Sequence, residues 1–250
     1  GRLGDPPTHP ELLDWLASEL VRQGYSLKKM HRLIVTSSAY KMSSAPERRA
    51  LEVDPQNLLF WRVDARRLEA EAIRDAILAT NGKLELSMGG PGFYPEIPQV
   101  VLQGQSQPGS GWGSSSERDR ARRSIYIHVK RSLIPPFLDV FDFADTDQTC
   151  PERFATVQPT QALTMLNSDH MAHESKAFAS RLRREAGDST AAQVERAIWL
   201  ALSRPPESAE IEAGVRLIGD LVRVHGIEPE RALELFALTV LNLNEFIYVD

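Results

Sequence analysis

Residues 233–249, LELFALTVLNLNEFIYV, carry the pattern that decides the fold class. The large apolar residues recur at alternating spacings of three and four: Leu233, Phe236, Val240, Leu243 and Ile247. This spacing places them on one face of an α-helix, and Leu235, Leu238 and Leu241 broaden that face. A helix this apolar belongs in the centre of a protein, so the stretch predicts a mainly α fold.

The same run does not have the composition of a membrane span. Asn242, Asn244 and Glu245 interrupt it, and burying these side chains in lipid is costly. We therefore interpret the run as a core helix and predict no membrane span. With 250 residues, of which 42% are hydrophobic, the chain is long enough to bury a sizeable core.

Helical patterns extend outward from this run toward the N-terminus. Pro159 is expected to open a helix that ends near residue 185. Near the start of the chain, Thr8 and Glu11 form the pattern of a capping box, and Ser26 and Asp64 are expected to cap two further helices. The sequence thus predicts a helical bundle-like body, which we assign to one domain.

That domain is predicted to cover residues 1–250, as a fragment of a longer protein. The first residues carry neither an initiator Met nor the pattern of a signal peptide, which is the basis for expecting a fragment.

Residues 83–124 break the helical pattern. Gly and Pro interrupt helices, and Gly and Ser leave the chain many conformations. We predict a long irregular insertion in which Tyr94 and Trp112 hold the loop to the body or contact a ligand. Loops of this length are often functional.

Residues 125–157 are predicted to form a polar strand-and-loop segment that crosses the helical body. Over residues 123–129, Ile125, Ile127 and Val129 alternate with polar residues, which is the period of a strand with one buried face. This strand is expected to pair with residues 99–102. The fold class is therefore mainly α with a small β hairpin or strand pair.

Seven charged residues in and beside this segment form the candidate polar site. They are Lys130, Arg131, Asp139, Asp142, Asp145, Asp147 and Arg153. The aspartates suggest a calcium site, but an EF-hand loop needs alternate ligands, a Gly at its turn and a closing Glu, and Phe141 and Phe143 interrupt this series. We predict no metal site. The aspartates are expected to cap backbone amides or to pair with the three basic residues, and the phenylalanines to anchor the core.

The remaining motifs assign no catalytic residue. The order His170, His173, Glu174 differs from the zinc-hydrolase patterns His-Glu-x-x-His and His-x-x-Glu-His. The sequence has no Gly-x-Ser-x-Gly turn, and its one cysteine, Cys150, precedes a proline and is interpreted as a small buried thiol. The sequence therefore leaves the catalytic residues unknown.

Charge and cysteine content restrict the partners and cofactors. The 29 Lys and Arg are dispersed among 34 Asp and Glu, for a net charge of -5, so no basic surface for nucleic acid is expected. The sequence has no Cys-x-x-Cys-His for covalent haem. We predict no cofactor in this chain.

Four separated blocks match one family in order. They are DPPTHPELLDWLASEL at 5–20, VKRSLIPPFLDVFDFADTD at 129–147, CPERFATVQPTQALTMLNS at 150–168 and LNLNEFIYVD at 241–250. The chain resembles Planctomycete-specific domain 1, a domain of unknown function. The resemblance implies a place at the C-terminal end of a large exported planctomycete or verrucomicrobial protein. It also implies an extracytoplasmic setting, periplasmic or at the cell surface, and haem c on a neighbouring cytochrome-c-like domain.

Two hypotheses of function follow. The first is a noncatalytic interaction or scaffold module that docks neighbouring domains of its parent protein or a polysaccharide, through the candidate polar site with Tyr94 and Trp112. The second is an enzyme that acts on glycans through two of the four aspartates, whose carboxyl groups would stand roughly 5 to 9.5 Å apart across a cleft. The missing catalytic motifs favour the first.

Overall fold

The computed structural model describes residue 4 and residues 6–146, 149–150 and 153–249. It divides the chain into two compact units, Gly1–Arg66 and Arg67–Val249, which we describe separately. The expectation of a single domain over residues 1–250 concerns cooperative folding and stays a prediction.

The first unit contains three helices: α1 (Pro10–Arg22), α2 (Leu27–Val35) and α3 (Arg48–Val53). Ser26 caps α2 as predicted, since its hydroxyl accepts from the Lys29 N–H at 3.4 Å. The other two predicted caps are wrong. His9 precedes α1 without a side-chain cap, and Asp64 accepts from two side chains of its own loop. Met30 is the only buried hydrophobic residue described in this unit.

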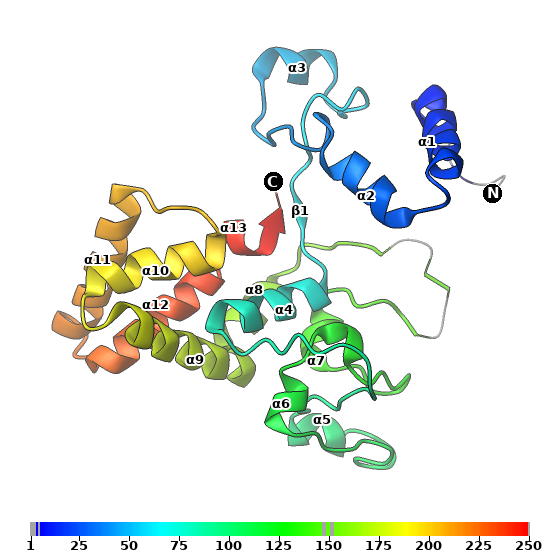
Figure 1. Cartoon of the computed structure of the whole chain (residues 1–250). Helices are drawn as coiled ribbons and strands as arrows, with labels where there is room; N and C mark the ends of the chain where they lie inside the picture. The colour runs from blue at the N-terminus through cyan, green and yellow to red at the C-terminus, as the bar shows by residue number, and fades with distance from the viewer. Residues whose placement is uncertain (1–3, 5, 147–148, 151–152, 250) are drawn as a thin grey trace. The chain divides into compact units, whose positions relative to one another are not determined.

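The second unit is a layered helical body (Figure 1). Its longer helices are α4 (Ala70–Asn81), α8 (Pro159–Asn167), α9 (Asp169–Ala186), α10 (Thr190–Leu202), α11 (Ser208–Arg223) and α12 (Pro229–Leu241). Shorter turns of helix are α5 (Gln99–Gln103), α6 (Glu117–Arg120), the 3-10 helix η1 (Ser124–Tyr126), α7 (Pro136–Val140) and α13 (Asn244–Ile247). The predicted mainly α class is confirmed.

The core of this body lies where α9 and α12 pack together, with α4 and α10 against α9. Phe178 and Leu182 of α9 and Leu241 of α12 are fully buried, and Ile73 and Ile77 join them from α4. The apolar stretch that predicts a central helix does provide one.

Two helices predicted as continuous are divided. The C-terminal helix ends at Leu241 and a short α13 follows, because the Asn242 side chain donates to the carbonyl oxygens of Leu238 at 2.8 Å and of Met165 at 3.2 Å. The helix predicted to run from Pro159 to about residue 185 is interrupted at Ser168, whose hydroxyl caps α9. Short polar side chains thus end helices that apolar periodicity alone would continue.

The predicted strand at residues 123–129 is wrong. Its residues 124–126 form η1, and the expected partner segment forms α5. The backbone of this stretch is held by α4 instead: Ser124 donates its N–H and hydroxyl to Asp75 at 2.7 Å, and Arg74 donates to the Arg122 carbonyl at 3.1 Å. Ile125, expected to be buried, is 74% exposed.

The small strand pair lies elsewhere. It consists of β1 (Arg66–Arg67) and β2 (Tyr248–Val249), and the next hydrogen bond runs from the Leu68 N–H to the Ile247 carbonyl at 2.8 Å. An isolated parallel bridge joins Phe93 to Ile127. That bridge attaches the irregular insertion to the body.

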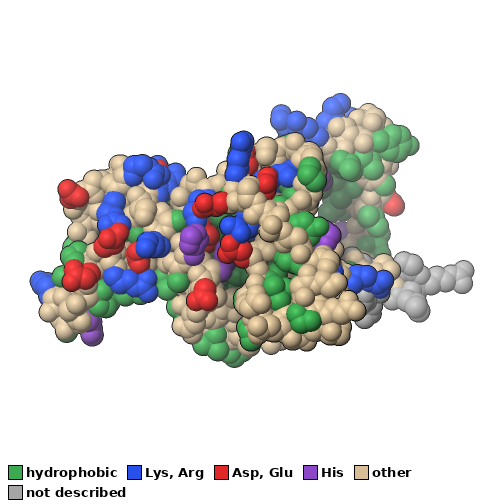
Figure 2. All heavy atoms as spheres, turned by 90° about the horizontal axis from the view of Figure 1, so that it is seen from below, with side chains coloured by type: hydrophobic (Ala, Val, Ile, Leu, Met, Phe, Trp, Pro, Cys, Tyr) green, Lys and Arg blue, Asp and Glu red, His purple; other side chains and the backbone are tan. Residues whose placement is uncertain are grey.

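Acidic and basic side chains are interspersed on the face shown in Figure 2. Several of the charged side chains in the second unit form ion pairs. The most connected is Arg204, which follows α10. Its guanidinium binds Glu210 of α11 at 2.7 and 2.9 Å and Glu245 of α13 at 2.5 and 2.7 Å. Hydrogen bonds from Arg204, followed by one from the Glu207 N–H, lower the pKa of Glu210 from 4.5 to about 2.

Replacing Arg204 by glutamine is expected to make the free energy of unfolding depend less on pH in the acidic range. Because the pKa of Glu210 is depressed in the folded protein, its contribution is complete above about pH 5 and is lost as the pH falls toward 2. Both side chains are about one-third exposed, so screening leaves about 1 kcal/mol. Thermal unfolding between pH 7 and pH 2.5 should show a lower Tm for R204Q at neutral pH and a smaller fall on acidification. A fall in Tm on acidification as large as that of the unaltered protein would contradict this prediction. The control is Arg223→Gln, which alters an exposed arginine.

Candidate functional site

Asp142 occupies an unusual backbone position at the end of α7. The Phe143 N–H donates to the Leu138 carbonyl at 3.1 Å and the Asp142 N–H to the Asp139 carbonyl at 3.2 Å, which is the pattern of a Schellman motif. Asp142 has φ of 60° at the position where glycine is usual. Asp142 therefore carries a side chain at a position where the backbone conformation favours glycine.

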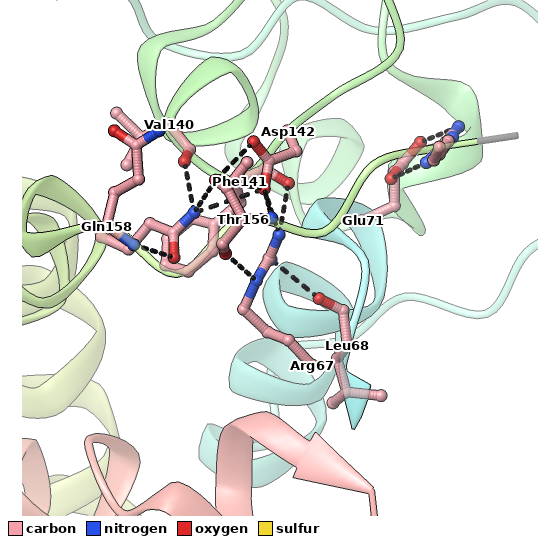
Figure 3. A network of polar contacts seen from close by, with 10 residues as sticks. Arg67, Leu68, Glu71, Val140, Phe141, Asp142, Thr156 and Gln158 are labelled. Carbon is pink, nitrogen blue, oxygen red and sulfur yellow. Dashed lines mark hydrogen bonds and ion pairs between the residues drawn. The ribbon is translucent and has the colours of Figure 1, made fainter. Parts of the chain in front are cut away.

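The Asp142 carboxylate is surrounded by donors from three segments (Figure 3). Arg67 Nη2 of β1 donates at 2.5 Å, and the Thr156 N–H and hydroxyl each donate at 2.9 Å. Gln161 Nε2 of α8 donates at 3.3 Å to Asp142 and at 3.1 Å to the Val140 carbonyl. Both oxygens of Asp142 are engaged.

Arg67 is equally committed to this network. Its side chain is only 4% exposed, and it also donates to the carbonyl oxygens of Leu68 at 3.0 Å and Phe141 at 3.4 Å. The guanidinium carbon lies 5.3 Å from the centre of the Phe141 ring, a cation–π contact. The network joins β1, α7 and α8, so its main effect is to hold the non-helical segment in place.

Arg153 forms a second brace beside the first. Its guanidinium binds Glu71 of α4 at 2.7 and 2.9 Å and approaches Glu69 at 3.3 Å. It also lies 5.5 Å from the centre of the Phe143 ring. The hydrogen bonds that Arg153 donates to Glu71 raise the pKa of Arg153, which stays charged.

Neither Lys130 nor Asp139 belongs to these braces. Lys130 donates to the Ser110 carbonyl, and Asp139 is exposed on α7. Arg131 and Asp145 are also exposed, and Asp147 lies outside the described residues.

Of the two roles expected for the aspartates, Asp142 shows the first, since it accepts from the Thr156 backbone N–H. Its ionic partner is Arg67, instead of Lys130, Arg131 or Arg153. Arg67, Thr156 and Gln161 were not predicted as members of this site. The doublet Arg66–Arg67 carries no sequence signal, since its pairing depends on contacts over 75 residues of sequence.

A second feature is an open pocket of about 180 Å³ in the irregular insertion. Its walls include Tyr94, Ile97, Leu102, Trp112 and Arg120. The Tyr94 and Trp112 rings meet edge to face with centroids 5.5 Å apart. The structure therefore places both aromatic residues predicted to contact a ligand on one pocket wall.

Local contacts fix these two rings. The Trp112 indole N–H donates to the Pro95 carbonyl at 3.2 Å, and the Tyr94 N–H donates to the Ser115 hydroxyl at 2.9 Å. Gly113 packs so closely on Tyr94 that a Cβ there would lie 2.7 Å from the ring. His128 supports the pair from behind, with ring centroids 4.5 Å from Tyr94. The pocket is preformed.

Comparison with known proteins gives one match. The family model described as PSD1, protein of unknown function (DUF1553), matches residues 1–218. The chain belongs to the PSD1 family. No curated protein and no solved structure matches it.

Both features lie within the matched part of this PSD1 chain. The braces around Asp142 and Arg153 and the pocket of Tyr94 and Trp112 fall between residues 67 and 161, whereas α12 and α13 lie beyond residue 218. In the described part of the chain, none of the helices has both the length and the apolar character needed to cross a membrane.

A buried polar cluster joins α4 to α9 in the PSD1 chain. Glu174 accepts from Asn81 and lies 3.3 Å from the Lys83 ammonium, which is 3.0 Å from His173. Burial lowers the pKa of His170, whose Nε2 has no hydrogen-bond partner among the described residues. No three His, Cys, Asp or Glu side chains in the described residues are placed to hold a metal ion. Cys150 is exposed, so the expectation of a buried thiol is wrong.

Proposed function

We propose that this chain is a noncatalytic interaction module that binds a carbohydrate in the pocket of Tyr94 and Trp112. In this proposal it serves an exported, cytochrome-c-like multidomain protein, outside the cytoplasm and beside a haem-bearing domain. Its biological setting is polysaccharide-related metabolism. The setting rests on the family resemblance alone, whereas the ligand class rests on the pocket.

The observation that carries the proposal is a pair of half-buried aromatic rings on the wall of an open pocket. A sugar ring presents C–H groups that pack on an aromatic face, and its hydroxyl groups need polar partners at the rim. Glu96 and Arg120 supply such partners and form an ion pair with each other at the pocket. The Trp112 ring is already held by the Pro95 carbonyl and the Tyr94 ring by Gly113 and His128, so both lose little entropy on binding.

The enzyme alternative receives less support. Asp142, one of the four candidate aspartates, has both oxygens hydrogen-bonded and carries an ion pair with Arg67. A nucleophile needs an accessible lone pair, and the hydrogen bonds to both oxygens of Asp142 compete for its lone pairs. Asp139 is exposed on α7, and neither of the two pockets described for the chain includes it.

Replacing Trp112 by alanine is expected to weaken binding of neutral oligosaccharides by about tenfold or more, because one stacked ring contributes about 1 to 2 kcal/mol with the area it buries. Calorimetric titration of the 250-residue chain with a panel of neutral hexasaccharides measures the affinity. Fluorescence of Trp112 should also change as the ligand covers it.

The matched control is Trp199→Ala, because Trp199 is a solvent-accessible tryptophan on α10, 45% exposed and outside the pocket. It should bind as the unaltered protein does. Equal binding by the Trp112 and Trp199 variants, or no binding of any saccharide, would contradict the proposal.

A further inference from the structure

A second hollow, of about 310 Å³, adjoins the same insertion. Its lining consists of Glu85, Ser87, Met88, Gly89, Gly90, Arg118, Asp119 and Arg122. Residues 85–90 form one wall and the segment around α6 forms the other, and the two are joined by an isolated parallel bridge between Glu85 and Arg122. The proposed function does not use this hollow.

Arg122 brings a positive charge to this hollow without a carboxylate partner. The residue is only 7% exposed, and its two terminal nitrogens donate to the Pro91 carbonyl at 2.8 Å and to the Gly89 carbonyl. Its guanidinium stacks on the Tyr126 ring at 3.9 Å. Among the described residues no acid lies within ion-pair distance of it, and its Nε has no hydrogen-bond partner. Carbonyl dipoles hold the cation in place but do not neutralise it, so an anion in the hollow is favoured.

Arg118 is the exposed counterpart of Arg122. Its side chain is 81% exposed and donates to Glu85 at 2.9 Å. An exposed ion pair of this kind contributes little, so Arg118 can exchange Glu85 for a ligand at small cost. The second acid of the hollow, Asp119, already accepts from the Ser116 hydroxyl at 2.6 Å.

Helix α6 separates the two pockets. Arg118, Asp119 and Arg122 line the charged hollow, while Arg120 lines the aromatic pocket. Successive helical residues are rotated by about 100°, so residue 120 points away from the flank that carries residues 118 and 119. A ligand must therefore extend about 10 Å, the diameter of a helix, to reach both.

We propose that the two pockets are subsites for one acidic oligosaccharide, with a sugar ring stacked on Tyr94 and Trp112 and an oxyanion group held by Arg118 beside Arg122. This inference rests on the proposed carbohydrate binding and adds the ligand class and its minimum length. The oxyanion is a carboxylate or a sulfate ester, since either accepts hydrogen bonds from a guanidinium.

Hexagalacturonate and its methyl ester test the proposal, because they share one backbone and differ in charge. Titration of the 250-residue chain at low salt is expected to give about tenfold or tighter binding of the acid than of the ester. This preference should largely disappear between about 10 mM and about 1 M salt, as the Debye length falls from about 30 Å to about 3 Å. A sulfated carrageenan hexasaccharide identifies the preferred oxyanion, and preference for either acidic ligand over the neutral ester supports the proposal.

Variants assign the charge effect to the hollow. Arg118→Gln should reduce the acid-to-ester preference about fivefold or more, whereas Arg223→Gln, which alters another exposed arginine paired with an acid, should leave it unchanged. Glu85→Gln should tighten binding of the acid several-fold, because it removes the competing carboxylate. Neither Arg118 nor Glu85 lies in the core, so both variants are expected to fold.

The outcomes separate this inference from the proposed function. Equal binding of acid and ester, unaffected by Arg118→Gln but weakened by Trp112→Ala, would overturn the charged subsite and leave carbohydrate binding in place. Absence of binding to every saccharide would overturn both. Tighter binding of dimers than of hexamers would overturn the requirement for an extended ligand.

Discussion

Replacing Phe141 by alanine is expected to lower the free energy of unfolding by about 3 to 5 kcal/mol. Phe141 is 2% exposed and belongs to the core of the second unit, where its ring meets Phe137 at 5.0 Å and lies beneath the Arg67 guanidinium. Truncation leaves a cavity between α7 and the body and removes the cation–π contact. For a domain of this size the Tm should fall by about 6 to 20 °C, as measured by calorimetry.

The control is Phe154→Ala, which removes the same atoms from a side chain that is 84% exposed. Surface substitutions of this kind change stability by about 0.5 kcal/mol or less. Similar melting temperatures for the two variants would show that Phe141 does not anchor the segment.

The position of Phe141 illustrates what the sequence could predict. A large aromatic side chain such as that of Phe141 is usually buried, even when acidic residues flank it. Its burial can therefore be predicted from composition and local pattern. The same holds for the apolar stripe of residues 233–249, since periodicity alone identifies the central helix. Both interpretations are confirmed, although Asn242 ends that helix earlier than periodicity indicates.

The strand predicted at residues 123–129 shows where local pattern is insufficient. Alternation of isoleucines favours a strand only if the backbone groups find a neighbouring strand. Here Asp75 of α4 takes the Ser124 N–H and Arg74 takes the Arg122 carbonyl, so the pairing with Phe93 is confined to an isolated bridge at Ile127 and η1 forms beside it. Such a contact between residues about 50 positions apart leaves no mark in the sequence of either segment.

The candidate sites were predicted to different degrees. Tyr94 and Trp112 could be predicted as site residues because aromatic side chains in a long Gly-rich loop indicate a packing or binding role. Both do line one pocket. The partner of Asp142 could not be named, because β1 is two residues long and carries no periodicity. From charge alone, several basic residues could have paired with Asp142. Only the three-dimensional fold identifies Arg67 as its partner.

Removing either member of the Arg67–Asp142 pair is expected to destabilise the second unit strongly. The two single variants should differ in the stability that they lose. Asp142→Ala leaves the Arg67 cation, 4% exposed, without its carboxylate, at a cost of about 3 to 5 kcal/mol. Arg67→Met leaves Asp142, which is 22% exposed and keeps its hydrogen bonds from Thr156, so its cost should be smaller. The double variant should lose less than the sum, by a coupling of about 1 to 3 kcal/mol.

Urea unfolding of the four proteins measures this cycle, and Asp142→Asn separates charge from shape because asparagine tolerates the left-handed backbone at φ of 60°. The neighbouring Glu71–Arg153 pair is the matched control, since its side chains are 22% and 33% exposed and its coupling should be about 1 kcal/mol or less. If the Arg67–Asp142 coupling were no larger than this, the network would not brace the segment. Asp142 would then be kept in a left-handed turn for a reason other than stability, which would return attention to a role in binding or reaction.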